Sequence, residues 1–184
     1  MIEVIFKSKG SEHKGMIPGE FSEVTCKQFM AFESLESPVQ ILAAVMGIDL
    51  SFLLNSSSDL TPVMNRLINT LNDRPAYFDI PTDKGFKILD KIVKFPKNIQ
   101  KMMFGQVLQI KDLIDVDINK NLLKIASISI QPIFDGEFKE DRQPYFMEII
   151  EGLPVINVFP SLFFFAETLK KYRKYGRVTF QELF

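Results

Sequence analysis

The most informative stretch of the sequence lies between residues 119 and 130 and reads Asn119-Lys-Asn-Leu-Leu-Lys-Ile-Ala-Ser-Ile-Ser-Ile130. Asn119 is placed to cap a helix, because its side chain can accept a hydrogen bond from a free backbone N–H of the first turn. The helix that follows is apolar at positions 122, 123, 125, 126, 128 and 130, so little of its circumference is polar. Such a helix must be buried, and we expect it at the centre of the core.

Two further helices are expected after the central one. Pro132 and the turn Phe134-Asp135-Gly136 are expected to end the central helix, and a charged stretch then leads to a short helix around residues 146–150. The break Gly152-Leu153-Pro154 precedes the longest periodic segment, Val155 to Tyr175, which has apolar side chains along one side.

The long helix is expected to end in a basic turn followed by Gly176. Residues Arg177 to Phe184 form a tail in which Val178 and Phe180 alternate with polar residues. This alternation predicts either a short strand or a segment that docks on a neighbour.

Helix starts are also marked on the N-terminal side of the central helix. Thr25, with Gln28 three residues on, predicts a capping box. Ser37-Pro38 and Thr61-Pro62 each place a capping residue before a Pro in the first helical turn. Another helix is expected to start near Phe104.

Strands are expected at two places. Ile2 to Lys7 show the period of two that is typical of a strand, whereas residues 8–20 contain three glycines and a Pro-Gly step and are expected to form a loop. Phe86 to Phe95 are compatible with two short strands around Asp90-Lys91 or with one short helix.

The predicted fold class is α+β and predominantly α-helical, in a single compact helical domain with small strand or hairpin elements. The chain has 184 residues, of which 46% are hydrophobic, and it contains no internal repeat and no long linker. We therefore expect one domain over residues 1–184, made of a strand and loop at 1–20, a helical body at 25–175 with the hairpin at 86–95, and a tail at 177–184.

Charge and cysteine content narrow the function classes. The 22 basic and 23 acidic residues nearly balance, which argues against a general nucleic-acid binder. The single cysteine, Cys26, cannot form an intramolecular disulfide, so a cytoplasmic protein is expected. The N-terminal residues do not resemble a secretory signal, and the apolar stretch from Leu153 to Ala166 is too short to span a membrane.

No residue pattern predicts catalytic, cofactor-binding or metal-binding chemistry, so we expect a protein that is not an enzyme and needs no cofactor. His13 lies in a polar loop without metal-ligand spacing and is expected at the surface. Cys26 is expected to act as a small buried hydrophobe. Asp112, Asp115 and Asp117 lack the Gly and the closing Glu of a calcium loop and are expected to form a solvated acidic edge. A small enzyme is the least favoured alternative.

Two groups of residues on the last helix are candidates for binding a partner. Three successive helix positions cover about 200° of arc, so three successive Phe side chains cannot all face one core. The basic cluster near the helix end is explained either by the helix dipole or by contact with a partner or nucleic acid. These candidates are Phe163, Phe164 and Phe165, and Lys170, Lys171, Arg173, Lys174 and Arg177.

The order of features along the chain resembles structural and assembly proteins of tailed bacteriophages, most of all head-tail connector or tail ring proteins of crAss-like phages. The resemblance covers most of the chain and rests on its layout, in which Gly105-Gln106 is the most recognisable pair. The features are the N-terminal strand, Pro18-Gly19, the Thr25-led helix with Phe29, Val93-Lys94-Phe95-Pro96, Met103-Phe104-Gly105-Gln106, and Gly152-Leu153-Pro154 before a Phe-rich helix.

This resemblance implies a non-enzymatic virion structural protein that forms a ring by self-association in the head-tail connector or tail. Its implied partners are further copies of itself and other virion proteins, such as the portal or neighbouring ring proteins, and no membrane. The basic helix end would face either DNA in a channel or an acidic neighbour. It would be assembled in the host cytoplasm and end up in the virion. The alternative is a tail assembly chaperone that acts in morphogenesis and is absent from the mature virion.

Overall fold

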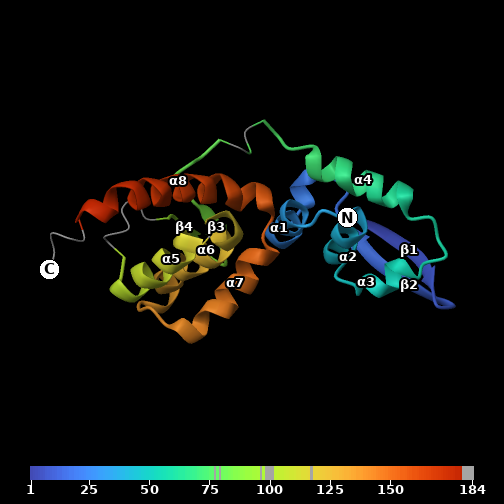
Figure 1. Cartoon of the computed structure of the whole chain (residues 1–184), viewed down its shortest axis with the longest axis horizontal. Coiled ribbons are helices and arrows are strands. Elements are labelled where there is room, and N and C mark those ends of the chain that lie inside the picture. Colours follow the sequence, from blue (N-terminus) through green and yellow to red (C-terminus); the bar gives the residue numbers. More distant parts are fainter. Residues whose placement is uncertain (77, 79, 96, 98–101, 117, 180–184) are drawn as a thin grey trace. The chain divides into compact units, whose positions relative to one another are not determined.

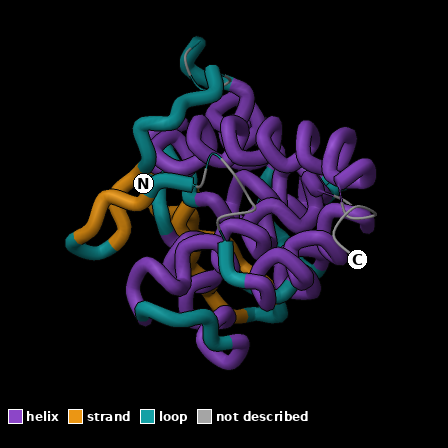
Figure 2. The backbone as a smooth tube through the Cα atoms, turned by 90° about the vertical axis from the view of Figure 1, so that its left-hand side faces the viewer, coloured by secondary structure: helices purple, strands orange, loops and turns teal. Residues whose placement is uncertain are grey.

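The computed structural model describes residues 1–76, 78, 80–95, 97, 102–116 and 118–179. Over these residues the fold is α+β and mostly helical, as predicted, and the strands are confined to short hairpins (Figure 2). The helices are α1 (Cys26–Ser34), α2 (Pro38–Met46), α3 (Leu50–Leu54), α4 (Thr61–Asn72), α5 (Phe104–Val116), α6 (Ile118–Asp135), α7 (Gln143–Gly152) and α8 (Val155–Thr179). The strands are β1 (Ile2–Ser8), β2 (Ser11–Ile17), β3 (Phe86–Ile88) and β4 (Lys91–Val93).

The chain divides into two compact units. The first comprises Met1–Ala76 with Pro154–Ile156, and the second comprises Tyr77–Leu153 with Asn157–Phe184. In Figure 1 the first unit contains β1, β2 and α1 to α4, and the second contains β3, β4 and α5 to α7 with most of α8. The expectation of a single domain over residues 1–184 stays a prediction.

The first unit opens with an antiparallel hairpin, β1 with β2, in which Ile2 lies opposite Ile17. The strand over residues 2–7 is confirmed, but the loop expected over residues 8–20 is wrong for β2. Lys9 (φ 51°) and Gly10 (φ 79°) both take left-handed angles, which suit a two-residue turn between strands of normal twist. Gly10 therefore belongs to the tight turn of a hairpin, and the residues that follow it form a strand and not a long loop.

Gly15 lies within β2 for a packing reason. A Cβ atom there would lie 2.1 Å from the terminal methyl of Met46 and 3.1 Å from its Cβ, so Gly15 leaves room for the Met46 side chain at the end of α2. The buried side of the hairpin carries Val4, Phe6 and Ile17.

The helix starts of the first unit follow the predicted signals. The Thr25 hydroxyl accepts the Gln28 N–H while the Gln28 side chain accepts the Thr25 N–H, so the capping box is confirmed. Pro38 lies in the first turn of α2, and Gly47 (φ 67°) ends that helix in the left-handed region. The helix predicted after Thr61-Pro62 is also confirmed, although Leu60 and not Thr61 occupies the position before its first turn.

The second unit is built around α6, as the sequence predicts. Every residue of α6 from Leu122 to Gln131 except Lys124 is buried, and the helix packs against both α5 and α7 (Figure 1). The hydroxyl groups of Ser127 and Ser129 donate to backbone carbonyls one turn back in the same helix, which satisfies these buried polar groups.

The predicted start of α6 is wrong, whereas its predicted end is right for the turn at Gly136 and wrong for Pro132. The helix begins at Ile118, so Asn119 lies inside its first turn and does not occupy the capping position. Pro132 does not end the helix but lies within it, and the helix runs on to Asp135. Gly136 (φ 76°) ends it, because glycine takes the left-handed conformation that a terminating residue needs.

The region 86–95 forms a hairpin, which decides between the two alternatives. Strands β3 and β4 pair in antiparallel register, with Phe86 opposite Val93, around the turn Leu89-Asp90. The turn expected at Asp90-Lys91 is therefore wrong by one residue, because Lys91 belongs to β4.

Helix α8 contains Pro160, whose carbonyl accepts the Thr82 N–H at 2.9 Å. The helix continues past Gly176 to Thr179, so its expected end at Gly176 is wrong, as is a strand over residues 177–179. The rest of the predicted tail, residues 180–184, lies outside the described residues. No helix of the described residues has both the length and the apolar character required for crossing a membrane.

Candidate functional site

The three Phe residues singled out on α8 take different positions. Phe165 is fully buried and stacks on Phe95, with ring centroids 4.5 Å apart and an interplanar angle of 4°. Phe163 is half-buried and meets the rings of Phe78 and Phe159 edge-on. Phe164 is half-buried. Phe165 thus belongs to the core, through the segment that follows β4, and a partner-binding role of Phe163 and Phe164 stays a prediction.

The basic residues of α8 are described in part. Lys170 and Lys171 are exposed, and the Lys170 ammonium lies 2.9 Å from the Glu167 carboxylate, one turn earlier. That hydrogen bond lowers the pKa of Glu167 below its ordinary value. The side chains of Arg173, Lys174 and Arg177 lie outside the described part. The partner-binding role of these α8 residues stays a prediction.

The titratable residues considered in the sequence do not assemble into a reactive centre among the described residues, and no cluster there has the side chains to hold a metal ion. Cys26 is buried, as expected. His13 is not a freely solvated side chain: it lies half-buried, with its ring centroid 5.4 Å from that of Phe6 and 4.6 Å from that of Phe52. The expectation for His13 missed this contact because Phe6 lies opposite His13 in a hairpin that the sequence did not predict. Asp112 and Asp115 are exposed on α5, and Asp117 lies outside the described residues.

The tip of the β3–β4 hairpin carries an unusual residue. Leu89 has φ 53°, in the left-handed region, and its side chain is 58% exposed. For a residue with a branched side chain this conformation costs about 1 to 2 kcal/mol, because its Cβ crowds the following carbonyl. A Leu at this position does not lower the strain of the left-handed backbone, and its exposed side chain does not fill the core. The stability of the fold therefore does not explain why this residue is Leu.

The hairpin that carries Leu89 has a second exposed apolar side chain, beside the exposed Lys87, and a firm base. Ile92, 71% exposed, follows three residues after Leu89, whereas Phe86, Ile88 and Val93 of the same strands are buried. The ring of Phe95 packs against Phe86 and Phe165, which ties the hairpin to α8.

A second link joins the hairpin to the end of α6. The Lys91 ammonium donates to the Ile133 carbonyl at 3.2 Å and lies 5.0 Å from the centre of the Phe134 ring. Leu89 and Ile92, which we call the hairpin tip, are thus two large apolar side chains held outward on a supported element.

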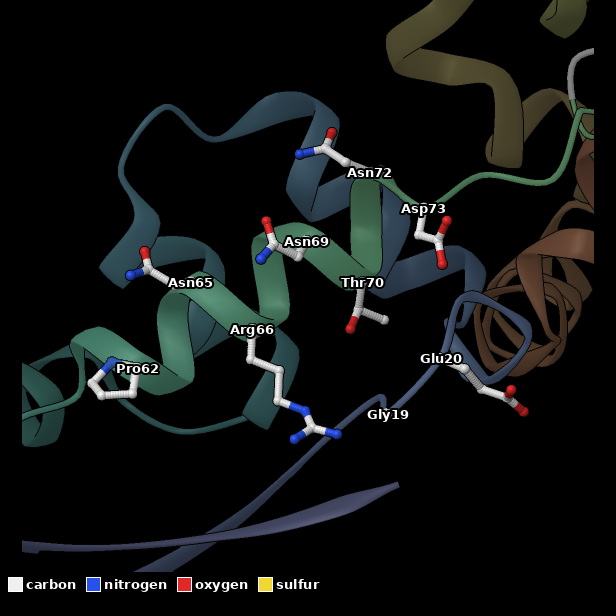
Figure 3. Close-up of a pocket in the computed structure, with 9 residues that line it drawn as sticks. All are labelled: Gly19, Glu20, Pro62, Asn65, Arg66, Asn69, Thr70, Asn72 and Asp73. Atoms are coloured by element: carbon white, nitrogen blue, oxygen red, sulfur yellow. The ribbon is translucent and has the colours of Figure 1, made fainter.

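The first unit contains a wide, open groove of about 830 Å³ along one face of α4 (Figure 3). The other side of the groove is formed by the loop that follows β2. The residues that line it are Gly19, Glu20, Pro62, Asn65, Arg66, Asn69, Thr70, Asn72 and Asp73.

The α4 side of the groove is unusual for a helix. Asn65, Asn69 and Asn72 recur at spacings of four and three residues and so share one face. Asn is a poor helix former, by roughly 0.7 kcal/mol relative to Ala within a helix, and these exposed side chains form no hydrogen bond with the described residues. Arg66, also exposed, forms no ion pair there. Helix stability therefore does not account for these residues.

Sequence analysis missed both of these features. The Asn spacing was visible in the sequence, on the face of α4 opposite the buried Leu67 and Leu71. The exposed Leu89 was not, because Leu-Asp is not a typical hairpin turn and nothing local identifies Leu89 as the residue with positive φ.

Comparison with known proteins does not identify the chain. No protein family matches its sequence, no curated protein is significantly similar to it, and no solved structure matches its fold. The functional argument therefore rests on the residues of the chain itself.

Proposed function

We propose that the chain is a non-enzymatic structural protein of a tailed-phage particle, which self-associates into a ring of the head-tail connector or tail. Two things support the proposal: the order of features along the sequence, which resembles such proteins, and the strained and exposed Leu89 at the hairpin tip. Strained residues persist where function requires them, and exposed apolar groups are typical of protein contacts. A contact between copies would bury the tip.

Ring closure constrains how such a contact is made. Around a cyclic axis, each subunit must present two different surfaces, one of which receives the other from the next copy. In this proposal the hairpin tip is the inserted surface. Candidates for the other contact surfaces are the half-buried Phe163 and Phe164 and the basic end of α8. Candidate partners for these surfaces are the portal or another ring protein, and DNA is a candidate partner for the basic cluster.

Native mass spectrometry of the purified full-length chain tests self-association. We expect one closed oligomer with a fixed number of copies. A monomer at every concentration, or an open series of growing oligomers, would contradict ring formation.

The location of the protein needs a separate measurement. Quantitative mass spectrometry of purified particles should find the chain at a fixed, small ratio to the portal protein. Its absence from particles, together with abundance in the infected-cell lysate, would instead favour the tail assembly chaperone.

A further inference from the structure

We propose that three lysines of the β3–β4 hairpin and its flanks bind the phosphate backbone of duplex DNA, without reading its sequence. These are Lys84, Lys87 and Lys94, which we call the hairpin lysines. The proposal goes beyond ring formation and does not rest on it, because a single copy of the chain carries all three.

The hairpin region carries a local surplus of positive charge. Residues 83–97 contain five lysines and two aspartates, in a chain whose net charge is −1. The near balance of the whole chain therefore conceals an uneven distribution of charge. A local surplus of one sign attracts a partner of the opposite sign.

Two of these five lysines are already engaged within the protein. The Lys97 ammonium pairs with the Asp83 carboxylate, on which Lys94 acts only at longer range. The Lys91 ammonium donates to the Ile133 carbonyl. The three hairpin lysines are exposed and form no ion pair with any described residue, so their charges are available to a ligand.

The fold brings two of the hairpin lysines close together. Lys87 lies opposite Ile92, and both side chains are exposed whereas the adjacent Phe86 is buried. A Cβ atom on Gly85 would lie 2.8 Å from the Lys94 Cγ, so the stem of Lys94 lies against Gly85. Two residues span at most about 7 Å, so Lys94 and Lys87 can reach neighbouring phosphates of one strand.

The charge density of a duplex suits flexible lysines. Duplex DNA carries one negative charge per about 1.7 Å of helix axis. Lysine places a point charge on a flexible stem, so each ammonium can reach a phosphate in several orientations of the duplex. An acidic protein offers carboxylates at sparser, fixed positions, which arginine binds well through paired hydrogen bonds. Residues 83–97 contain no arginine.

The hairpin region offers nothing that would read a base or anchor a membrane. Its only aromatic residues, Phe86 and Phe95, are buried, so no ring there is exposed on which an unpaired base could stack. Contacts to phosphate carry no sequence information. Trp and Tyr, which anchor proteins at the level of lipid headgroups, do not occur in residues 83–97.

Fluorescence anisotropy with a short labelled DNA duplex, at several salt concentrations, tests the proposal on the full-length protein. Each phosphate contact contributes about −0.9 to the slope of log affinity against log salt. The variant Lys84→Gln/Lys87→Gln/Lys94→Gln should therefore flatten the slope by about 2.7. At low salt it should also bind about tenfold more weakly or worse. Duplexes of different sequence should bind equally.

The triple variant Lys7→Gln/Lys14→Gln/Lys124→Gln is the matched control. It removes the same charge from exposed lysines elsewhere and should keep the slope of the natural chain. Circular dichroism will check that both triple variants fold. Leu89→Asn/Ile92→Ser, which alters only the hairpin tip, should keep its salt-dependent binding, so failure of self-association and failure of DNA binding are distinguishable.

Lysine acetylation read by mass spectrometry gives a second measurement that needs no variant. Bound duplex should protect the hairpin lysines from acetylation and leave Lys7, Lys14 and Lys124 as reactive as before.

Five results would overturn the proposal. These are no saturable binding of the duplex at low salt, unchanged binding by the variant of the hairpin lysines, or an equal loss in both triple variants. The others are tighter binding of polyglutamate than of the duplex, and tighter binding of vesicles made of equal parts phosphatidylserine and phosphatidylcholine.

Discussion

Leu89 combines a left-handed backbone with an exposed apolar side chain, and its replacement should separate folding from association. Leu89→Asn should raise the free energy of unfolding by about 1 kcal/mol, because Asn takes the left-handed conformation at lower cost. Little packing is lost at a side chain that is 58% exposed. Urea denaturation at a concentration where the chain is monomeric measures the effect.

A second replacement tests whether relief of backbone strain causes the higher free energy of unfolding expected for Leu89→Asn. Leu89→Val should destabilise the hairpin, since β-branched side chains tolerate positive φ least. If Leu89→Asn is no more stable than the natural chain, the strain argument is wrong.

Asp135 gives the second unit a defined dependence on pH. The Gln131 side-chain amide donates to the Asp135 carboxylate at 2.8 Å, and Arg142 adds an ion pair at 3.3 Å. These contacts lower the pKa of Asp135 below its ordinary value of 3.8. Because the folded pKa is the lower one, the unfolded chain binds the proton more readily, and this contribution to stability is lost as pH falls through the folded value.

We therefore expect stability to decline below about pH 4, and to decline less steeply in Asp135→Asn. Urea denaturation of both proteins across that pH range provides the comparison. Parallel pH profiles would show that Asp135 contributes nothing to the dependence.

At the scale of elements, Phe165 of α8 supports the β3–β4 hairpin by stacking on Phe95, which packs against Phe86. Phe165→Ala should cost about 3 to 5 kcal/mol, because it removes a fully buried ring that stacks on Phe95. Phe164→Ala is the control at the adjacent position, where the side chain is only half-buried, and should cost less. Thermal and urea unfolding will rank the two variants, and equal costs would contradict the assigned packing.

The elements with strong local signals were predictable from the sequence. The apolar circumference of residues 122–130 identified the buried helix, and Thr25 with Gln28 placed the start of α1. These signals succeed because they act within one or two helical turns. Pro132 and Gly176 were wrongly expected to end α6 and α8, because helical packing outweighed their local tendencies, whereas the turn at Gly136 was predicted.

Strand β2 shows the limit of local signals most plainly. Its residues, Ser11 to Ile17, are mostly polar and include Gly15, and no local preference makes them a strand. They pair because β1 offers its full length across a two-residue turn, and because Gly15 makes room for Met46. Contacts between residues that lie far apart in the sequence cannot be predicted from a short stretch of it.

At the scale of the whole molecule, thermal unfolding distinguishes a single domain from two units that unfold independently. Scanning calorimetry of the full chain should give one cooperative transition if residues 1–184 fold as one domain. Two separate transitions would show that the units unfold independently, and would contradict the single-domain prediction.

The candidate contact surfaces were only partly predictable. The sequence pointed to α8, but the strain at Leu89 depends on the backbone of a folded turn. The α4 groove needs the loop after β2 to complete it, and that loop lies far from α4 in the sequence. Both features depend on how segments of the folded chain are arranged in space, and this arrangement cannot be predicted from composition or periodicity.

Sedimentation velocity of the double variant Leu89→Asn/Ile92→Ser, beside the natural chain, tests the central claim most directly. Leu54→Ser is the matched control, because Leu54 is 65% exposed on α3 and lies outside the hairpin tip. We predict that the natural chain and the control sediment as the same closed oligomer and that the double variant sediments as a folded monomer. An unchanged oligomer in the double variant would contradict self-association through the hairpin tip.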